Sequence, residues 1–405
     1  MPHGGAYDSR VTSPTNDPTV PALRVVVAPD SFKGSLDAAE VARCLAAGVR
    51  SVAPDAHVVE LPVADGGEGT LDALAAGGGV RTVVVDTVDA IGRPATARLG
   101  LSADGTVAVV ELAEASGLPA VSDVRLQPLH AGTRGTGDLA RAALDAGVEE
   151  ILVCLGGSAS TDGGAGVLRA LGARLLADDG TDVPDGGEGL ARVASLDLAG
   201  LHPRARAVRW RLAVDVTNPL VGERGAAAVF GPQKGAGPAD VEFLDAALDR
   251  WAGVLEAATG VDVRELPGAG AAGGVPAALV AVLGAETERG STLVAETVGL
   301  PAAVADADLV LTGEGSFDSQ SVHGKVADTI GALAAAAPVP PPVVVIAGRV
   351  LLPVAQAREA GIAAAFSIAP GPIELDALLD RTAVRLTEVA AAVTSLHLAG
   401  RHAGR

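Results

Sequence analysis

Cysteine, basic residues and long apolar runs are all scarce in this chain of 405 residues. The two cysteines, Cys44 and Cys154, both lie among aliphatic neighbours, which favours small buried side chains over a disulfide scaffold or a zinc site. No apolar run reaches the roughly 20 residues that a membrane helix needs, because prolines interrupt the longest candidate, ALAAAAPVPPPVVVIAG. These absences predict a cytoplasmic protein that does not span a membrane.

The shortage of basic residues leaves the chain acidic, with 30 Lys and Arg against 49 Asp and Glu and a formal net charge of −19. This charge opposes sequence-independent binding to nucleic acid or to an anionic membrane. Chemistry on a small molecule is therefore the favoured class of function. An anionic substrate would require a site that gathers positive charge from lysines, arginines and helix N-termini.

The chain repeats one pattern after a polar start. Residues 1–23 are rich in Pro, Thr, Asp and Gly and lack the apolar core of a signal peptide, so we expect a disordered leader there. From residue 24 onward, a short β-branched run, a loop rich in Gly, Ser, Thr and Asp, and an Ala-rich helix follow one another four times. Continuous apolar strands alternating with helices predict parallel sheets covered on both faces, with ligands bound beyond the carboxyl ends of the strands.

The middle of the chain has a different texture. Between residues 81 and 288, segments such as RTVVVDTVDA and VRWRLAVDVT are typical of half-exposed strands in a mixed sheet. We therefore expect an α/β protein in which residues 24–80 and 289–397 form one domain with a parallel sheet, and residues 81–288 form an inserted α/β domain with a mixed sheet. The parallel strands are expected near Val25, His57, Leu309, Val343 and Ala363. The active site is expected in the cleft between the domains.

The 30 basic residues comprise 27 arginines and only three lysines, Lys33, Lys234 and Lys325, each of which adjoins a glycine. A compact ammonium group at a phosphate or carboxylate cannot be exchanged freely for a planar guanidinium. Lysines that persist against such a bias towards arginine are therefore candidates for anion binding, with chance survival on the surface as the alternative.

Two loops near the start of the chain combine charge with glycine. In APDSFKGSLDAAE, Ser35 is the expected N-cap of a helix, and Lys33 precedes it beside free backbone N–H groups, an arrangement suited to an anion. Asp30 and Ser31 share this loop and are further binding candidates. In LPVADGGEGT, Asp65 and Glu68 flank two glycines and could hold Mg²⁺ or position a hydroxyl for deprotonation. Ordinary turns with solvated acids are the alternative.

Four more segments carry candidate side chains in glycine-rich surroundings. GTRGTGD and GGSASTDGGAG present hydroxyls and N–H groups suited to phosphate, although neither is a P-loop, and plain glycine turns are the alternative. DVTNPLVGERGAAAVFGPQKGAG and LTGEGSFDSQSVHGK mix carboxylate, amide and cation. The binding candidates in these four segments are Thr133, Thr136, Ser158, Ser160, Asp162, Asp215, Asn218, Lys234, Glu314, Asp318 and Lys325.

One further segment, GAGAAG at residues 268–273, matches the dinucleotide pattern G-x-G-x-x-G. The preceding VDVREL alternates in polarity and ends at Pro267, whereas the dinucleotide motif needs a buried strand that runs directly into the glycines. We interpret GAGAAG as a tight loop that lines a pocket.

Eight segments, taken in order, resemble the bacterial glycerate kinase family of two-domain, type I enzymes over about Arg24 to His397. They are VVVAPDSFKGSL, LPVADGGEGT, ELAEASGL, GTGDLARAALDAG, GGSASTDGGAG, DVTNPLVGERGAAAVFGPQKGA, PGAGAAGG and LTGEGSFDSQSVHGK. The resemblance implies ATP-dependent phosphorylation of D-glycerate, at the 2-hydroxyl, with Mg²⁺. It also implies that the domain built from both chain ends is Rossmann-like with three layers.

On this interpretation, the catalytic candidates are Lys33, Asp65, Glu68, Asp215 and Lys325, and the candidates to hold Mg²⁺ beside the nucleotide phosphates are Asp65, Glu68, Asp215 and Glu314. The partners are D-glycerate and ATP, with a homodimer left open. The rival functions are an NAD-dependent oxidoreductase of a small hydroxy acid, which rests on GAGAAG, and a non-catalytic hydroxy-acid sensor on the same fold.

The chain departs from the family pattern at three positions. Arg134 stands where the family usually has Tyr in T-Y-G-T-G, Thr161 where it has Asn before Asp-Gly-Gly, and Ser316 where it has Arg after G-E-G. The last departure removes a cation where an anionic substrate would need one. Arg134 and Arg349 are the candidates to replace it.

Overall fold

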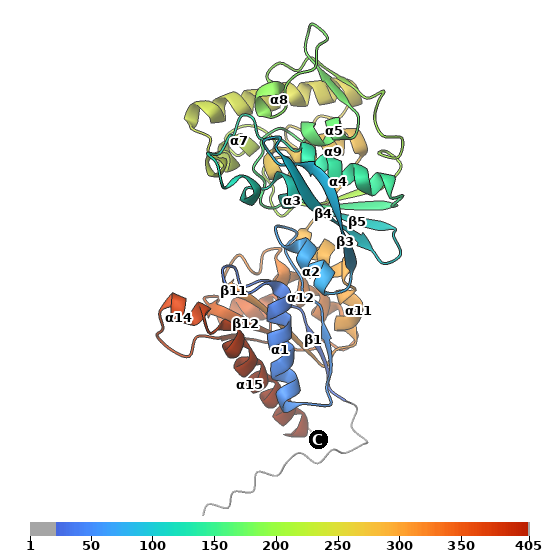
Figure 1. Ribbon diagram of the computed structural model, residues 1–405. Coiled ribbons are helices and arrows are strands. Elements are labelled where there is room, and N and C mark those ends of the chain that lie inside the picture. The colour runs from blue at the N-terminus through green and yellow to red at the C-terminus, as the bar shows by residue number, and fades with distance from the viewer. Residues whose placement is uncertain (1–21, 404–405) are drawn as a thin grey trace, which may run out of the picture.

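The computed structural model describes residues 22–403, whose two large sheets are placed one above the other (Figure 1). Apart from residues 22 and 23, the predicted leader lies outside the described residues. In the lower half of Figure 1, α1 (Ala38–Val52) and α15 (Thr382–Ala403) lie side by side, so segments from the two ends of the chain meet there. None of the helices between residues 22 and 403 is long and apolar enough to cross a membrane.

The lower sheet has five parallel strands in the order β13-β12-β11-β1-β2. These strands are β1 (Arg24–Val27), β2 (His57–Glu60), β11 (Leu309–Phe317), β12 (Val343–Val350) and β13 (Ala364–Ser367). They begin within a residue or so of the predicted positions. The chain winds outward in one direction from β1 to β2 and in the other from β11 to β13, so the direction of winding changes between β1 and β11.

This parallel sheet is the middle one of three layers because its apolar side chains alternate between faces. Val25 and Val27 of β1 belong to one buried cluster with side chains of α1 and α15. Val26 belongs to a second cluster on the opposite face. The helices on that second face are α10 (Gly290–Thr297), α11 (Leu300–Ala305), α12 (Val326–Ala336) and α13 (Val354–Glu359).

The upper sheet has six strands in the order β10-β9-β6-β5-β4-β3 and is mixed. Its strands are β3 (Val80–Val88), β4 (Pro94–Ser102), β5 (Val107–Glu111), β6 (Glu150–Cys154), β9 (Arg209–Ala213) and β10 (Glu286–Glu288). The pairs β3·β4 and β4·β5 are antiparallel, and the remaining neighbours are parallel. A parallel sheet from both chain ends plus a mixed sheet from the middle confirms the predicted fold class, while the exact domain boundaries stay predictions.

Short helices and one long helix cover the mixed sheet. They are α3 (Ala113–Ser116), α4 (Arg134–Asp145), α5 (Ala165–Ala170), α6 (Gly187–Leu190), α7 (Ala226–Phe230), α8 (Pro238–Thr259) and α9 (Val275–Leu283). The 3₁₀ turns η1 (Pro119–Val121), η2 (Pro232–Lys234) and η3 (Ala271–Gly273) and the small hairpin of β7 (Arg174–Leu176) and β8 (Ser195–Asp197) complete this half. Trp210 and Trp251 are fully buried within its core.

The two halves share apolar contacts through α2 (Thr70–Ala76). Leu71 and Leu74 of α2 belong to the same buried cluster as Val26 of the parallel sheet and Leu152 of the mixed sheet. Because this cluster is continuous, α2 fixes the end of the parallel sheet beside the mixed sheet. The loops that follow β2 and β6 are thereby held close together.

Candidate functional site

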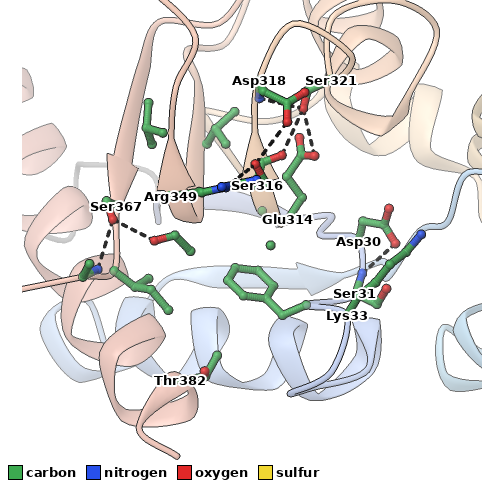
Figure 2. A pocket seen from close by; sticks show the side chains of 18 of the residues that line it. Asp30, Ser31, Lys33, Glu314, Ser316, Asp318, Ser321, Arg349, Ser367 and Thr382 are labelled. Carbon is green, nitrogen blue, oxygen red and sulfur yellow. Dashed lines mark hydrogen bonds between the residues drawn. The ribbon is translucent and has the colours of Figure 1, made fainter. Parts of the chain in front are cut away.

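A cavity of about 940 Å³ lies at the carboxyl ends of the parallel strands (Figure 2). The loop after β1, the end of β11 and the loop after β11 form one wall, at the point where the direction of winding changes. Ligands of open parallel sheets bind at such a change because the two loops diverge there and leave a crevice. The opposite wall comes from the end of β12, from the loop after β13 and from α14 (Leu375–Leu379).

The loop after β1 contributes Asp30, Ser31 and Lys33 to the cavity. The Asp30 N–H donates to Gly313 O of β11 at 2.8 Å, and its carboxylate Oδ1 accepts the Ser31 N–H at 2.6 Å. Burial, together with the negative charge of Asp65, raises the pKa of Asp30 to about 6. Lys33 is exposed at the same end, and its charge acts in the opposite direction on Asp30.

The start of α1 corrects one sequence prediction. Asp37, not Ser35, is the N-cap: its carboxylate accepts the Glu40 N–H at 2.7 Å, and the Glu40 carboxylate accepts the Asp37 N–H at 3.1 Å. A tight turn closed by Phe32 and Leu36 delays the helix by two residues. The Ser35 hydroxyl instead donates to Leu379 O at the end of α14, at 3.2 Å. Ser35 therefore connects the β1 loop to the opposite wall.

The carboxyl end of β11 and the loop after it place two more acidic side chains in the cavity, Glu314 on the strand and Asp318 on the loop. Glu314 accepts a hydrogen bond from the Ser321 hydroxyl at 2.9 Å, and Asp318 accepts one from the Ser316 hydroxyl at 3.1 Å. Burial raises the pKa of Glu314 to about 7, and the charge of Asp30 acts in the same direction. Nothing in the sequence pattern marks Ser321, which orients Glu314 only because the loop turns back on itself.

Lys325 precedes the first residue of α12 and lines the same cavity. Its positive charge lowers the pKa values of both Glu314 and Asp215, which are otherwise raised by burial. The partial positive charge of the α12 N-terminus adds to that of the Lys325 ammonium. This corner of the cavity is therefore suited to phosphate oxygens.

Arg349, one of the two suggested replacements for the missing cation, lines the cavity next to Ser316. Its Nε donates to the Ser316 hydroxyl at 2.9 Å. Arg134, the other suggestion, is exposed at the start of α4 and does not line this cavity.

A second, smaller cavity of about 230 Å³ opens beside the first, and Asp65 lines both. Its walls are the loops after β2, β6 and β9 together with η2 and η3. Asp215 in this cavity accepts the Gly290 N–H at 2.9 Å, while desolvation raises its pKa to about 6 and the Asp65 charge contributes to the rise. Ala271 and Ala272 of the GAGAAG segment also line this cavity, as the sequence predicts.

The glycines around Asp65 allow this close approach. Gly66 has φ of +83°, and a Cβ there would lie 2.6 Å from the Gly290 Cα and 2.7 Å from the Ala213 Cβ. Both the backbone conformation and the lack of space exclude a larger side chain. The turn after β2 therefore packs directly against the end of β9 and brings Asp65 and Asp215 to the same cavity.

Lys234 is almost completely buried, with 1% of its surface exposed, and lines the smaller cavity. Its ammonium donates to the Ser158 hydroxyl at 2.7 Å and to Ser160 O at 2.5 Å. Burial lowers the pKa of Lys234 to about 7, and the charge of Asp162 opposes this effect. Lys234 and Ser158 thus form one hydrogen-bonded unit on the wall of the cavity.

Other predicted binding residues lie away from the two cavities. Asp162 is buried and accepts from the Thr133 hydroxyl and N–H, each at 2.8 Å. The Thr136 hydroxyl donates to Ser116 Oγ at 2.9 Å, and the Asn218 amide donates to Arg224 O at 2.8 Å. The residues that line neither cavity are Ser35, Glu68, Thr133, Thr136, Ser160, Asp162 and Asn218. Glu68 faces a separate cavity of about 300 Å³ that Asp30 and Ser31 also line.

The donor set fits Mg²⁺ shared with a phosphate ligand. Among the described residues, no group of three or more His, Cys, Asp and Glu side chains is arranged to hold a metal by itself. Asp65 and Glu314 nevertheless line the larger cavity, and Asp215 joins Asp65 in the smaller one. Mg²⁺ in such sites typically takes one or two carboxylates and completes its shell with phosphate oxygens and water.

Comparison with known proteins gives a consistent result over nearly the whole chain. Residues 25–398 match the model of the glycerate kinase family. The chain is 45% identical over 361 residues to a glycerate kinase of Bacillus subtilis, covering 89% of this chain and 94% of that relative. It is 45% identical over 348 residues to a glycerate 2-kinase of Escherichia coli, covering 85% and 90%. A crystal structure named glycerate kinase 2, from Salmonella typhimurium LT2, matches with a TM-score of 0.85 and 44% identity, covering 94% of this chain and all of that one.

Proposed function

The chain belongs to the glycerate kinase family and is a glycerate-phosphorylating enzyme, and from this premise we propose that it transfers the γ-phosphoryl group of ATP to the 2-hydroxyl of D-glycerate with Mg²⁺. The observation that supports this proposal is the position of Asp65, whose side chain lines both cavities. A kinase must bring two substrates together at one point, and Asp65 marks such a point. Lys33 and Lys325 line the larger cavity together with Asp65.

Each charged group has a role in the proposal. Lys33 and Lys325 bind phosphate oxygens in the larger cavity, where positive charge stabilises the transferring group. Asp65 orients the acceptor hydroxyl and receives its proton. Glu314 and Asp215 would hold the ion together with the nucleotide, and a bound Mg²⁺ would offset the negative charge of the phosphates.

The rival functions have no support of their own. GAGAAG forms the turn η3 and the loop before it, and the last strand before it, β9, ends at Ala213, so a strand does not lead directly into the glycines as the dinucleotide motif requires. A sensor would be favoured if the loss of the expected arginine at Ser316 abolished catalysis, but Arg349 lies beside Ser316 and donates a hydrogen bond to its hydroxyl. A cytoplasmic location and a homodimer stay predictions.

Incubation with ATP, Mg²⁺ and a panel of small hydroxy acids, followed by phosphorus NMR of the products, tests the proposal. A phosphate on the 2-hydroxyl couples to one proton and gives a doublet, whereas a phosphate on the 3-hydroxyl couples to a CH₂ group and gives a triplet. We expect the doublet with D-glycerate, and no product when EDTA is added or glycerate is omitted. A triplet would move the site of phosphorylation, and ADP formation that does not depend on D-glycerate would overturn the proposal.

A further inference from the structure

We propose that the two substrates occupy separate cavities that meet at Asp65: the nucleotide lies in the 940 Å³ cavity with its base against residues 368–379, and the three-carbon acid lies in the 230 Å³ cavity beside Lys234. This inference rests on the proposed function and adds to it the place and orientation of each substrate. It follows from the sizes of the two cavities, from the chemistry of their walls and from their common boundary.

Size separates the two substrates first. Cavities that bind drug-sized ligands typically measure about 300–1,000 Å³. At about 940 Å³, the larger cavity has room for a nucleoside triphosphate. At about 230 Å³, the smaller one lies below that range and is suited to a three-carbon acid. The reverse arrangement would leave a nucleotide without enough space.

The wall of the larger cavity changes from apolar to charged along its length. One end is apolar and is formed by Ile368, Ile373, Leu375, Leu378 and Leu379. In Figure 2, Ser367 and Thr382 lie on this side of the cavity, while Lys33 and Asp30 lie on the other. The hydroxyls of Ser367 and Thr382 donate to Gly348 O and Leu378 O, so neither introduces a free donor.

This gradient orients the nucleotide. A flat base gains from contact with apolar side chains, whereas phosphates gain from cations and from the N-terminus of α12, which has 11 residues. Asp65 lies at the charged end, since its charge acts on Asp30 together with that of Lys33. A nucleotide with its base at the apolar end therefore points its phosphates towards Asp65 and the smaller cavity.

The smaller cavity has the chemistry of a carboxylate site. Lys234 and Ser158 line it and are joined by a hydrogen bond of 2.7 Å. Two of the three protons that a charged Lys234 carries are used within the protein, by Ser158 and by Ser160 O. A bound carboxylate would favour the charged form of this buried group and offset the cost of its burial.

Backbone strain is found on the wall of the same cavity. Ala272 has φ of +50° and is the one non-glycine residue with positive φ within residues 22–403. Such conformations cost free energy and tend to occur at ligand sites, where the surrounding structure maintains them. Ala272 lines the 230 Å³ cavity. The strain is therefore a second observation, independent of charge, that supports a ligand site there.

The transfer step balances with these positions. The hydroxyl oxygen of the acid attacks the γ-phosphorus from the smaller cavity, and a new P–O bond forms. The bond between the γ-phosphorus and the bridging oxygen breaks, and ADP leaves in the larger cavity. The hydroxyl proton passes to the Asp65 carboxylate between them. Asp65 is the only acid among the described residues that lines both cavities.

Steady-state kinetics with matched variants tests the assignment. Ile373→Ala and Leu378→Ser shorten the apolar end, and we expect each to raise KM for ATP about 10-fold and to change KM for glycerate less than about 2-fold. Val216→Phe fills the smaller cavity, which Val216 lines, and Lys234→Met removes its cation. We expect these two variants to raise KM for glycerate at least about 10-fold while KM for ATP stays within about 2-fold.

Val384→Ala is the control, because Val384 on α15 is 60% exposed and lines neither cavity, so both KM values should remain as in the wild type. Thermal shifts with MgATP measure nucleotide binding in any variant that loses turnover, and Val216→Phe should keep the wild-type shift. The assignment is overturned if the Ile373 and Leu378 variants raise KM for glycerate alone, or if Val216→Phe abolishes the shift with MgATP. A wild-type enzyme that forms no ADP with glycerate would instead refute the proposed function.

Discussion

Arg349 of β12 and Ser316 of β11 are paired in register across the parallel sheet, and the Arg349 Nε donates to the Ser316 hydroxyl at 2.9 Å. Ser316 stands where the resemblance to the family leads one to expect arginine. The guanidinium therefore reaches the same part of the cavity from the neighbouring strand. The positive charge is kept although its place in the sequence has changed.

Replacement of Arg349 tests this relationship. Hydrogen bonds to charged groups contribute about 1.5–3 kcal/mol. Because Arg349 is exposed, we expect its contribution to lie at the low end of this range, so Arg349→Ala should lower kcat/KM roughly 10-fold. Ser316→Arg in the Arg349→Ala background should restore most of that loss. The measurement is kcat/KM for ATP and for glycerate in all three proteins. A double variant no better than Arg349→Ala would contradict the exchange of positions.

The lysines at the larger cavity should be sensitive even to arginine. Removal of one preorganised charge contact costs about 2.7–4 kcal/mol, so Lys33→Ala and Lys325→Ala should lower kcat by roughly 10²–10³. Lys325→Arg should lose more activity than Lys33→Arg, because Lys325 is half-buried and Lys33 is exposed. Circular dichroism checks that each variant folds. Near-wild-type kcat in both arginine variants would mean that the ammonium geometry is unimportant.

Stability should depend on pH through Lys234. Burial lowers the pKa of Lys234 from 10.5 to about 7. Between these two values the unfolded chain holds a proton that the folded protein has released, so the free energy of unfolding rises with pH in this window, by at most about 1.4 kcal/mol per pH unit. Below about pH 7 Lys234 is protonated in the folded protein too, so the folded state bears the full free-energy cost of burying a charged ammonium.

Urea denaturation of the wild type and of Lys234→Met at pH values on both sides of this window measures the effect. The wild type should gain stability relative to Lys234→Met as the pH rises. Gln233→Met, a change at the exposed neighbour that has no titratable group, should show no such trend. A constant difference between the wild type and Lys234→Met at all pH values would show that Lys234 stays charged in the folded protein.

Activity should fall in mild acid. Burial raises the pKa of Glu314 to about 7 and that of Asp30 to about 6, so both carboxyls bind protons as the pH falls through this range. We expect kcat/KM to decrease below about pH 7 and, in Glu314→Gln, any remaining decrease to begin nearer pH 6. A pH profile of the free enzyme at fixed Mg²⁺ measures both. A flat wild-type profile from about pH 5 to about pH 8 is incompatible with a role for these carboxylates.

Mg²⁺ should bind with the nucleotide and only weakly alone. The described residues contain no cluster of three carboxylate, histidine or cysteine ligands, so phosphate oxygens must complete the shell. MgATP at about 100 times its Kd should stabilise the fold by about 2.7 kcal/mol, and Mg²⁺ alone should give little change in Tm. An equal shift with Mg²⁺ alone would reveal a site made entirely by the protein.

Much of the fold follows from local sequence patterns. The parallel strands near Val25, Leu309 and Val343 were predictable because buried parallel strands need continuous apolar residues. The position of Glu314 and Lys33 at one edge was predictable for a related reason, since all parallel strands end at the same side of a sheet. The ordered motifs also identified the family.

Only the tertiary structure decided which polar residues meet. Thr133 and Asp162 lie in segments as rich in glycine as the segment around Lys33. Their side chains nevertheless form a hydrogen bond with each other inside the half that contains the mixed sheet. Their sequence cannot reveal this, because burial depends on which loops pack together after the sheets form.

The sequence by itself determined the strands, their common edge, the family and most of the charged groups at that edge. The tertiary structure decided that Asp65 borders two cavities, that Arg349 lies beside Ser316, and that residues 368–379 form an apolar wall. The physical reason is range. Hydrophobic periodicity is a pattern among residues close together in the sequence, so it predicts local elements. A cavity is formed by strand order and register, which bring together residues hundreds of positions apart.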